Sequence, residues 1–136
     1  MRLRETIQVG RPPRHVFTAL AEPDRQGERA GWSSLERTAT GYNGVLQTSA
    51  GPIQIEFDCR FEVVEAEPDE HLRIRGQGVS PRLAFTIDAR FSLREHESAT
   101  EIELEADVDA AGELAGLGQR RLGEQARRLL TAYVAA

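Results

Sequence analysis

Lysine is absent from this chain of 136 residues, in which all seventeen basic residues are arginine. Without a lysine amine, the protein has no Schiff-base chemistry, no lysine nucleophile and no lysine for a phosphate-binding P-loop. Cysteine is almost absent too, and the single Cys59 excludes an intramolecular disulfide. Acidic residues outnumber basic residues, which gives a net charge of −5. This balance opposes the basic face that a nucleic-acid binder needs. We therefore expect no nucleic-acid partner.

Long apolar runs are missing as well. The first ten residues, MRLRETIQVG, lack the apolar core of a signal peptide. No stretch of the sequence contains the run of about eighteen apolar residues that a membrane span needs. We therefore expect a cytoplasmic protein, with a peripheral position at the inner membrane left open. The length suffices to bury one hydrophobic core, so residues 1–136 are expected to form a single domain.

What the chain does contain is a recurring alternation of apolar and polar residues, the pattern of strands with one buried face. Seven strands are predicted, at residues 2–9, 33–40, 42–49, 53–63, 72–78, 83–94 and 101–110. In the three longest, the inward positions are apolar: Ile53, Ile55, Phe57, Cys59, Phe61 and Val63; Leu83, Phe85, Ile87, Ala89, Phe91 and Leu93; Ile102, Leu104, Ala106, Val108 and Ala110. Long alternating strands of this kind favour an antiparallel sheet with one covered face.

Two helices complete the predicted α+β fold. A short one starts at Pro12 and Pro13 and stops at Pro23, because proline suits the first helical turn and interrupts a helix further on. Residues 112–136 change to a spacing of three and four, which predicts a long amphipathic helix. Its apolar positions are Leu114, Leu117, Leu122, Ala126, Leu129, Leu130, Tyr133 and Val134. This helix is expected to cover the concave face of the sheet and to leave an apolar space that suits a small molecule.

The strand at 101–110 carries an acid at every outward position. These side chains would repel one another unless basic residues faced them on neighbouring strands. Arg90 and Arg94 are expected to do so from the preceding strand, and Arg2 and Arg4 if the first strand lies alongside. We therefore interpret the acidic series as a solvated sheet face and, secondarily, as a docking surface for a basic partner.

Several segments together resemble a known family. They are GWSSLERT, GPIQIEFDCRFEV, GQG and the long stretch ELEADVDAAGELAGLGQRRLGEQARRLLTAY. In this order they are similar to the CoxG-like family of carbon monoxide dehydrogenase proteins, within the START-related superfamily (SRPBCC) of polyketide cyclases/dehydrases and lipid-transport proteins. The resemblance implies a helix-grip (START/Bet v 1-like) fold, a curved seven-stranded antiparallel sheet wrapped around a long C-terminal helix.

The family resemblance also implies a kind of function. Family members are accessory proteins of molybdenum-containing carbon monoxide dehydrogenases or related hydroxylases, and are implicated in membrane recruitment and in handling an apolar ligand such as a quinone. Members that attach to membranes carry an extended apolar tail, whereas this chain ends at Ala136 directly after its predicted helix. We therefore expect no stable membrane anchor. Relatives commonly have a Pro-Gly-Cys turn where this chain has Gly31 and Trp32, so no role for a thiol carries over to that turn.

Reactive groups are scarce among the predicted inward positions. Three histidines lie at turn-like places without a second ligand at metal-binding spacing: His15, His71 and His96. We expect no metal, no cofactor and no catalytic residue. Cys59 is interpreted as a small buried side chain rather than a nucleophile. Glu5 and Arg121 are the main charged residues that face inward, and Arg121 is predicted to lie at the cavity rim, where it meets a ligand carbonyl or simply extends into solvent.

We therefore hypothesise a non-catalytic binding protein that serves a molybdenum hydroxylase. Its cavity takes an apolar, quinone- or lipid-like molecule, and its predicted ligand-binding residues are Trp32, Phe57, Cys59, Phe85, Ile87, Leu114, Leu117 and Arg121. One alternative is an enzyme, a cyclase or dehydratase for polyketide-like compounds. Another is an accessory protein that binds no ligand and docks its partner through the long helix or the acidic face. A homodimer is also left open.

Overall fold

The computed structural model describes residues 2–26, 31–50, 53–81, 83–112 and 124. The predicted long C-terminal helix, with the candidate ligand contacts Leu114, Leu117 and Arg121, lies outside these described residues. The described residues form the sheet, the N-terminal helix and one short 3-10 turn.

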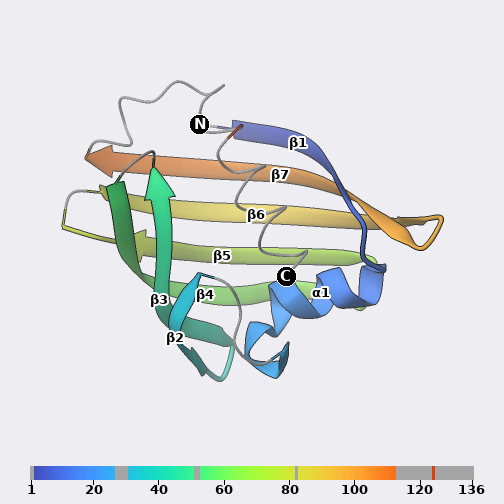
Figure 1. The fold of residues 1–136 in the computed structure, drawn as a ribbon, viewed down its shortest axis with the longest axis horizontal. Helices are drawn as coiled ribbons and strands as arrows, with labels where there is room; N and C mark the ends of the chain where they lie inside the picture. Colours follow the sequence, from blue (N-terminus) through green and yellow to red (C-terminus); the bar gives the residue numbers. More distant parts are fainter. Residues whose placement is uncertain (1, 27–30, 51–52, 82, 113–123, 125–136) are drawn as a thin grey trace.

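Seven strands form one antiparallel, strongly curved sheet (Figure 1). They are β1 (Arg2–Val9), β2 (Trp32–Arg37), β3 (Gly41–Ala50), β4 (Ile53–Glu67), β5 (His71–Val79), β6 (Leu83–His96) and β7 (Ala99–Gly112). Their order across the sheet is β1-β7-β6-β5-β4-β3-β2. Each strand from β2 to β7 thus lies beside its neighbour in the chain, and the first strand pairs with the last. The prediction of seven antiparallel strands is confirmed.

Strand β4 is longer than the sequence pattern predicts. It continues to Glu67, although the alternation breaks at Val63 and Val64. The pairing with β5 shifts register between Val63 and Glu65, and this irregularity absorbs the extra residue. Val64 is consequently 36% exposed, while Val63 packs against the core. A single inserted residue therefore extends the strand without turning its apolar side outward.

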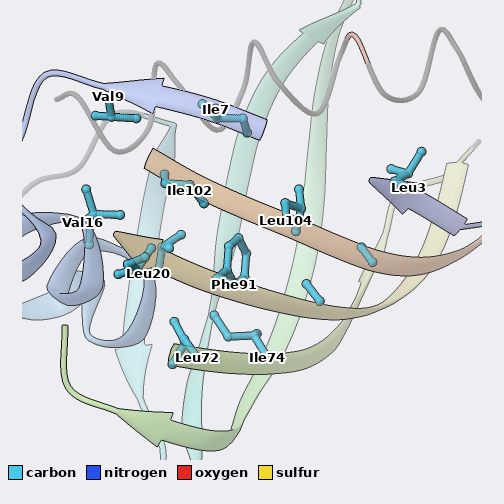
Figure 2. Packing of buried hydrophobic residues seen from close by; sticks show 14 residues of the cluster. Leu3, Ile7, Val9, Val16, Leu20, Leu72, Ile74, Phe91, Ile102 and Leu104 are labelled. Carbon is cyan, nitrogen blue, oxygen red and sulfur yellow. The ribbon is translucent and has the colours of Figure 1, made fainter. Parts of the chain in front are cut away.

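Helix α1 (Pro13–Ala21) and a short 3-10 turn, η1 (Pro23–Gln26), follow β1. Proline at the helix start lacks only an N–H group that would have no helical partner there. Val16, Ala19 and Leu20 are buried, and the helix packs against β5, β6 and β7. Figure 2 shows Val16 and Leu20 directed at the apolar side chains of these strands. The predicted short helix is thus confirmed, and its apolar face fixes one end of the sheet.

The inner face of the sheet, defined as the side on which α1 packs, carries the hydrophobic core (Figure 2). Its buried residues come from α1 and from β1, β5, β6 and β7: Leu3, Ile7, Val9, Val16, Ala19, Leu20, Leu72, Ile74, Ala89, Phe91, Leu93, Ile102, Leu104 and Ala106. These are the inward positions of the predicted alternation. The opposite side, the outer face, carries the polar members of the same strands.

Three of the five acids of β7 are matched by arginines on the neighbouring strands, and the predicted partners Arg2, Arg4 and Arg94 supply these pairs. Within the described residues, the fourth predicted partner, Arg90, forms no ion pair with β7. Arg2 Nε donates to Asp107 Oδ1 over 3.1 Å, and Arg2 Nη1 lies 3.4 Å from Glu105 Oε1. On the other side of β7, Arg94 Nη2 donates to Glu101 Oε2 over 3.0 Å. Such exposed pairs contribute little each, yet they remove the repulsion that a row of acids would otherwise impose.

Candidate functional site

A second apolar cluster lies on the inner face, mainly on β3 and β4 with contributions from β2 and the start of β6. This inner-face cluster consists of Trp32, Leu46, Ile55, Phe57, Cys59, Phe61, Leu83 and Phe85, from β2, β3, β4 and β6. Phe57, Cys59 and Leu83 are buried, and the other members are partly exposed. Because apolar surface with few polar groups is typical of small-molecule sites, we take this cluster as the candidate site.

Aromatic rings dominate the cluster and contact one another mostly at their edges. Phe57 and Phe85 meet in a T-shaped pair with ring centroids 5.3 Å apart. Trp32 meets Phe61 in the same manner at 6.4 Å. Tyr42 extends this network, because its ring packs 5.5 Å from Phe61 while its hydroxyl donates to the Leu20 carbonyl of α1 over 2.9 Å. The Tyr42 hydrogen bond therefore anchors the aromatic cluster to the helix.

Two glycines of β5 make room for these rings. Gly76 lies directly opposite Phe61 on β4, and Gly78 lies directly opposite Phe85 on β6. A Cβ atom at Gly78 would come within 2.6 Å of Phe85 Cζ, and one at Gly76 within 3.0 Å of Phe61 Cε1. Real side chains do not tolerate such contacts. The rings therefore rest directly on the β5 backbone, which recesses the aromatic surface into the sheet.

Cys59 contributes the one titratable group of the cluster. Its side chain is buried, and the thiol lies 3.6 Å from the Phe57 carbonyl, to which it donates. Burial, followed by the nearby Asp58 carboxylate, raises the pKa of the Cys59 thiol to about 11. A thiol of this pKa stays protonated at neutral pH and is a poor nucleophile. The structure thus agrees with the interpretation of Cys59 as a small buried side chain.

The family of the protein follows from comparison with known sequences. A family model for CoxG, one of the subunits of carbon monoxide dehydrogenase, matches residues 6–136. The chain belongs to this family. The resemblance noted in the sequence is therefore confirmed over nearly the whole length of this CoxG-family chain. No curated protein sequence matches it.

Solved structures support the same fold. A conserved protein from Geobacillus kaustophilus is 22% identical, with a TM-score of 0.77 over 96% of this chain and 87% of that one. Ara h 8.0201 is 11% identical, with a TM-score of 0.63 over 99% of this chain and 95% of that one. DynU16, from the dynemicin biosynthetic locus, is 21% identical, with a TM-score of 0.53 over 98% of this chain and 45% of that one. At these identities the likeness shows a Bet v 1-like fold and nothing more about function.

The structure brings together half of the predicted site residues. Trp32, Phe57, Cys59 and Phe85 all belong to the inner-face cluster. Ile87 lies instead at the margin of the larger core, beside α1 and its strands. Whether these side chains bind a ligand stays a prediction.

Other members of the cluster were not predicted as site residues. Leu46, Ile55, Phe61 and Leu83 share the inward register of the chosen residues, so the alternation alone could have added them. The sequence indicates the packing of Phe61 against Gly76 only weakly. Its sign there is the run Gly-Gln-Gly in a strand otherwise rich in bulky residues. Only the pairing of β4 with β5 shows what that glycine accommodates.

Two kinds of feature are absent from the part of the chain that the structure describes. There, no three side chains of His, Cys, Asp or Glu gather closely enough to hold a metal ion. No helix within those residues combines the length and the hydrophobicity needed to cross a bilayer. Glu5, the charged inward residue of β1, is half-buried opposite Leu104 of β7 and lies away from the inner-face cluster.

Proposed function

We propose that this CoxG-family protein is a non-catalytic carrier of an apolar, quinone- or lipid-like molecule and serves a molybdenum-containing carbon monoxide dehydrogenase-type enzyme. One domain spans residues 1–136, and the C-terminal helix predicted from the sequence, beyond β7, closes the cavity over the inner face. The observation that carries this proposal is the inner-face cluster, which joins four aromatic rings with a single titratable group, the protonated Cys59 thiol. The accessory role rests on the family alone.

The chemistry of the cluster supports a carrier over an enzyme. A cyclase or dehydratase needs acid and base groups that converge on the substrate. The cluster supplies only the thiol of Cys59, whose raised pKa leaves it unable to exchange protons near pH 7. Its other side chains offer apolar area, worth about 25 cal/mol for each Å² removed from water. Aromatic faces and edges add favourable contacts with a planar ring.

The single tryptophan provides a direct test of ligand binding. Trp32 belongs to the cluster, so a quinone bound there should quench its fluorescence. We expect titration with decylubiquinone, corrected for absorption by the quinone, to give saturable quenching. A charge placed on the inner face should oppose binding, because a buried unpaired ammonium is strongly unfavourable. We therefore expect Ile55→Lys to weaken binding by about tenfold or more.

A matched control lies one residue away. Glu56 is exposed on the outer face, where it accepts a hydrogen bond from Gln47 over 3.0 Å. We expect Glu56→Lys to leave the quinone affinity within about twofold of the unmodified protein. Absence of saturable quenching would refute the carrier proposal. Turnover of a polyketide-like substrate by the purified protein would instead establish the enzyme alternative.

A further inference from the structure

The outer face of the sheet contains a hollow that the proposed carrier function does not use. Its volume is about 540 Å³, which lies within the range of about 300–1,000 Å³ typical of ligand sites. It crosses the sheet from β7 to β3, and residues Thr38 and Thr40 of the β2–β3 turn border it. Phe61 of the inner-face cluster also borders the hollow through the thickness of the sheet, so the two sites are distinguished by changing only residues whose side chains lie on the outer face.

One row of side chains runs through this hollow, at right angles to the strands. The register sets each member directly opposite the next, and in order from β3 to β7 they are Asn43, Arg60, Gln77, Thr86 and Asp109. We call these five residues the outer row. Within the described part of the chain, none of their side chains forms an ion pair or a hydrogen bond. The outer row therefore presents Gln77 and Thr86 between one cation and one anion, with the Asn43 amide on the far side of the cation.

Most charges of the neighbouring row are already compensated. Asp88 accepts two hydrogen bonds from Arg73, at 3.0 and 2.8 Å, and Asp107 accepts one from Arg2 at 3.1 Å. Glu62 lies directly opposite an arginine of β5 in the β4–β5 pairing. The charges left to attract an occupant are the two in the outer row and the carboxylate of Glu62, which lies two residues from Arg60 on β4 and forms no ion pair within the described residues.

The separation of the two backbone positions that carry the outer-row charges sets the approximate spacing of a complementary ligand. Arg60 and Asp109 are three strands apart, which corresponds to about 14 Å at about 4.8 Å per strand. An extended peptide rises about 3.3 Å per residue and directs alternate side chains to the same side, so residues i and i+4 are about 13 Å apart and face the same way. We propose that the outer row binds an extended segment of a partner protein, with an acidic side chain at Arg60 and a basic side chain four residues away at Asp109.

The uncharged members of the row suit the backbone of such a segment. The Asn43 and Gln77 amides can each donate to and accept from a peptide group, and the Thr86 hydroxyl can do the same. A carboxylate held by an arginine gains charge-assisted hydrogen bonds at one end. This inference concerns the outer face only and does not depend on a ligand at the inner face.

Binding can be measured by NMR on the full chain with a capped pentapeptide, Glu-Thr-Ser-Thr-Arg. We expect its titration at millimolar concentration to shift the side-chain amide signals of Asn43 and Gln77. Arg60→Glu and Asp109→Arg should each weaken binding by about threefold or more, because a surface attraction becomes a repulsion. The double variant should restore the affinity to within about twofold, since the peptide can then bind in the reverse direction.

Two controls separate charge matching from general attraction. Glu103→Arg makes the same charge change on β7 but outside the hollow, and should leave the affinity unchanged within about twofold. A peptide with the charges two residues apart, Glu-Thr-Arg-Thr-Ser, should bind about threefold or more weakly than the first. Equal binding of the two peptides, failure of the double variant to recover, or no shift of the two amides would overturn the proposal. The dispersion of the backbone amide signals in the same NMR spectra serves as the fold check for every variant.

Discussion

The two faces of the sheet are built from alternate residues of the same strands and follow different physical rules. On β7, Ile102 and Leu104 face inward and are buried, while Glu103 between them is exposed. Inner-face residues are held by shape, because close-packed apolar atoms respond to a change of a single methylene. Outer-face residues interact mainly through their charges. Each pair contributes little, because solvent screens it and leaves the side chains free to move. Substitutions should therefore act through volume on one face and through sign on the other.

The largest expected contrast lies between neighbours on β7. Ile102 is 0% exposed, so Ile102→Ala removes fully buried methyl groups and leaves a cavity. We expect the free energy of unfolding to fall by about 3 kcal/mol. Glu103→Ala, one residue away on the outer face, should change it by less than about 0.5 kcal/mol. Denaturant unfolding of both variants measures this contrast, and similar losses would mean that the two faces do not differ in packing.

A smaller loss of stability is expected where the Phe85 ring packs against Gly78. Gly78→Ala places a methyl group where the ring now lies, so the ring must shift away from the β5 backbone. We expect a loss of about 1–3 kcal/mol in the free energy of unfolding. Gly10→Ala is the control, because no atom lies within 4 Å of the added methyl group and the backbone angle at Gly10 suits other residues. It should be neutral or stabilising by about 0.5 kcal/mol, and equal losses in denaturant unfolding would contradict the steric interpretation.

The smallest effect belongs to the outer face and depends on pH. Hydrogen bonds from Arg73 lower the pKa of Asp88 below its ordinary value of 3.8. A carboxylate whose pKa is lower in the folded protein stabilises the fold above its unfolded pKa, and this contribution is lost as pH falls through the folded pKa. We expect Asp88→Asn to lower the free energy of unfolding by no more than about 1 kcal/mol at neutral pH.

The pH profile of this difference provides the check. The gap between Asp88→Asn and the unmodified protein should be constant near neutral pH and should close below pH 3.8, where the unfolded carboxylate is protonated. Denaturant unfolding at a series of pH values measures it. A gap that widens on acidification would show that Arg73 is not the partner that stabilises this carboxylate.

Much of this contrast was visible in the sequence. The alternation predicted the buried and exposed faces of five of the seven strands, because side chains in a strand point to opposite sides in turn. The acids at alternate positions of β7 predicted basic partners on both neighbouring strands, and Arg2, Arg4 and Arg94 provide them. Proline at the start of α1 and at Pro23 predicted the bounds of the short helix.

Other features required the pairing of strands. The register shift between Val63 and Glu65 follows from how β4 meets β5, and two adjacent valines give no sign of it. From the sequence alone, the glycines of β5 would only weaken the strand. The pairing shows that Phe61 and Phe85 lie opposite them and occupy the space that side chains would fill. Likewise, the outer row joins residues from five strands that are up to 66 positions apart in the chain, from Asn43 to Asp109.

By itself, the sequence determined the secondary structure, the apolar and polar faces and the family of this protein. These properties depend on neighbours within a few residues, or on the order of motifs along the chain, and both can be read in one dimension. The tertiary structure decided which side chains share a site: the four rings on the inner face and the charge pair on the outer face. That choice depends on strand register, which a single inserted residue reverses, and register is set only when the whole sheet pairs.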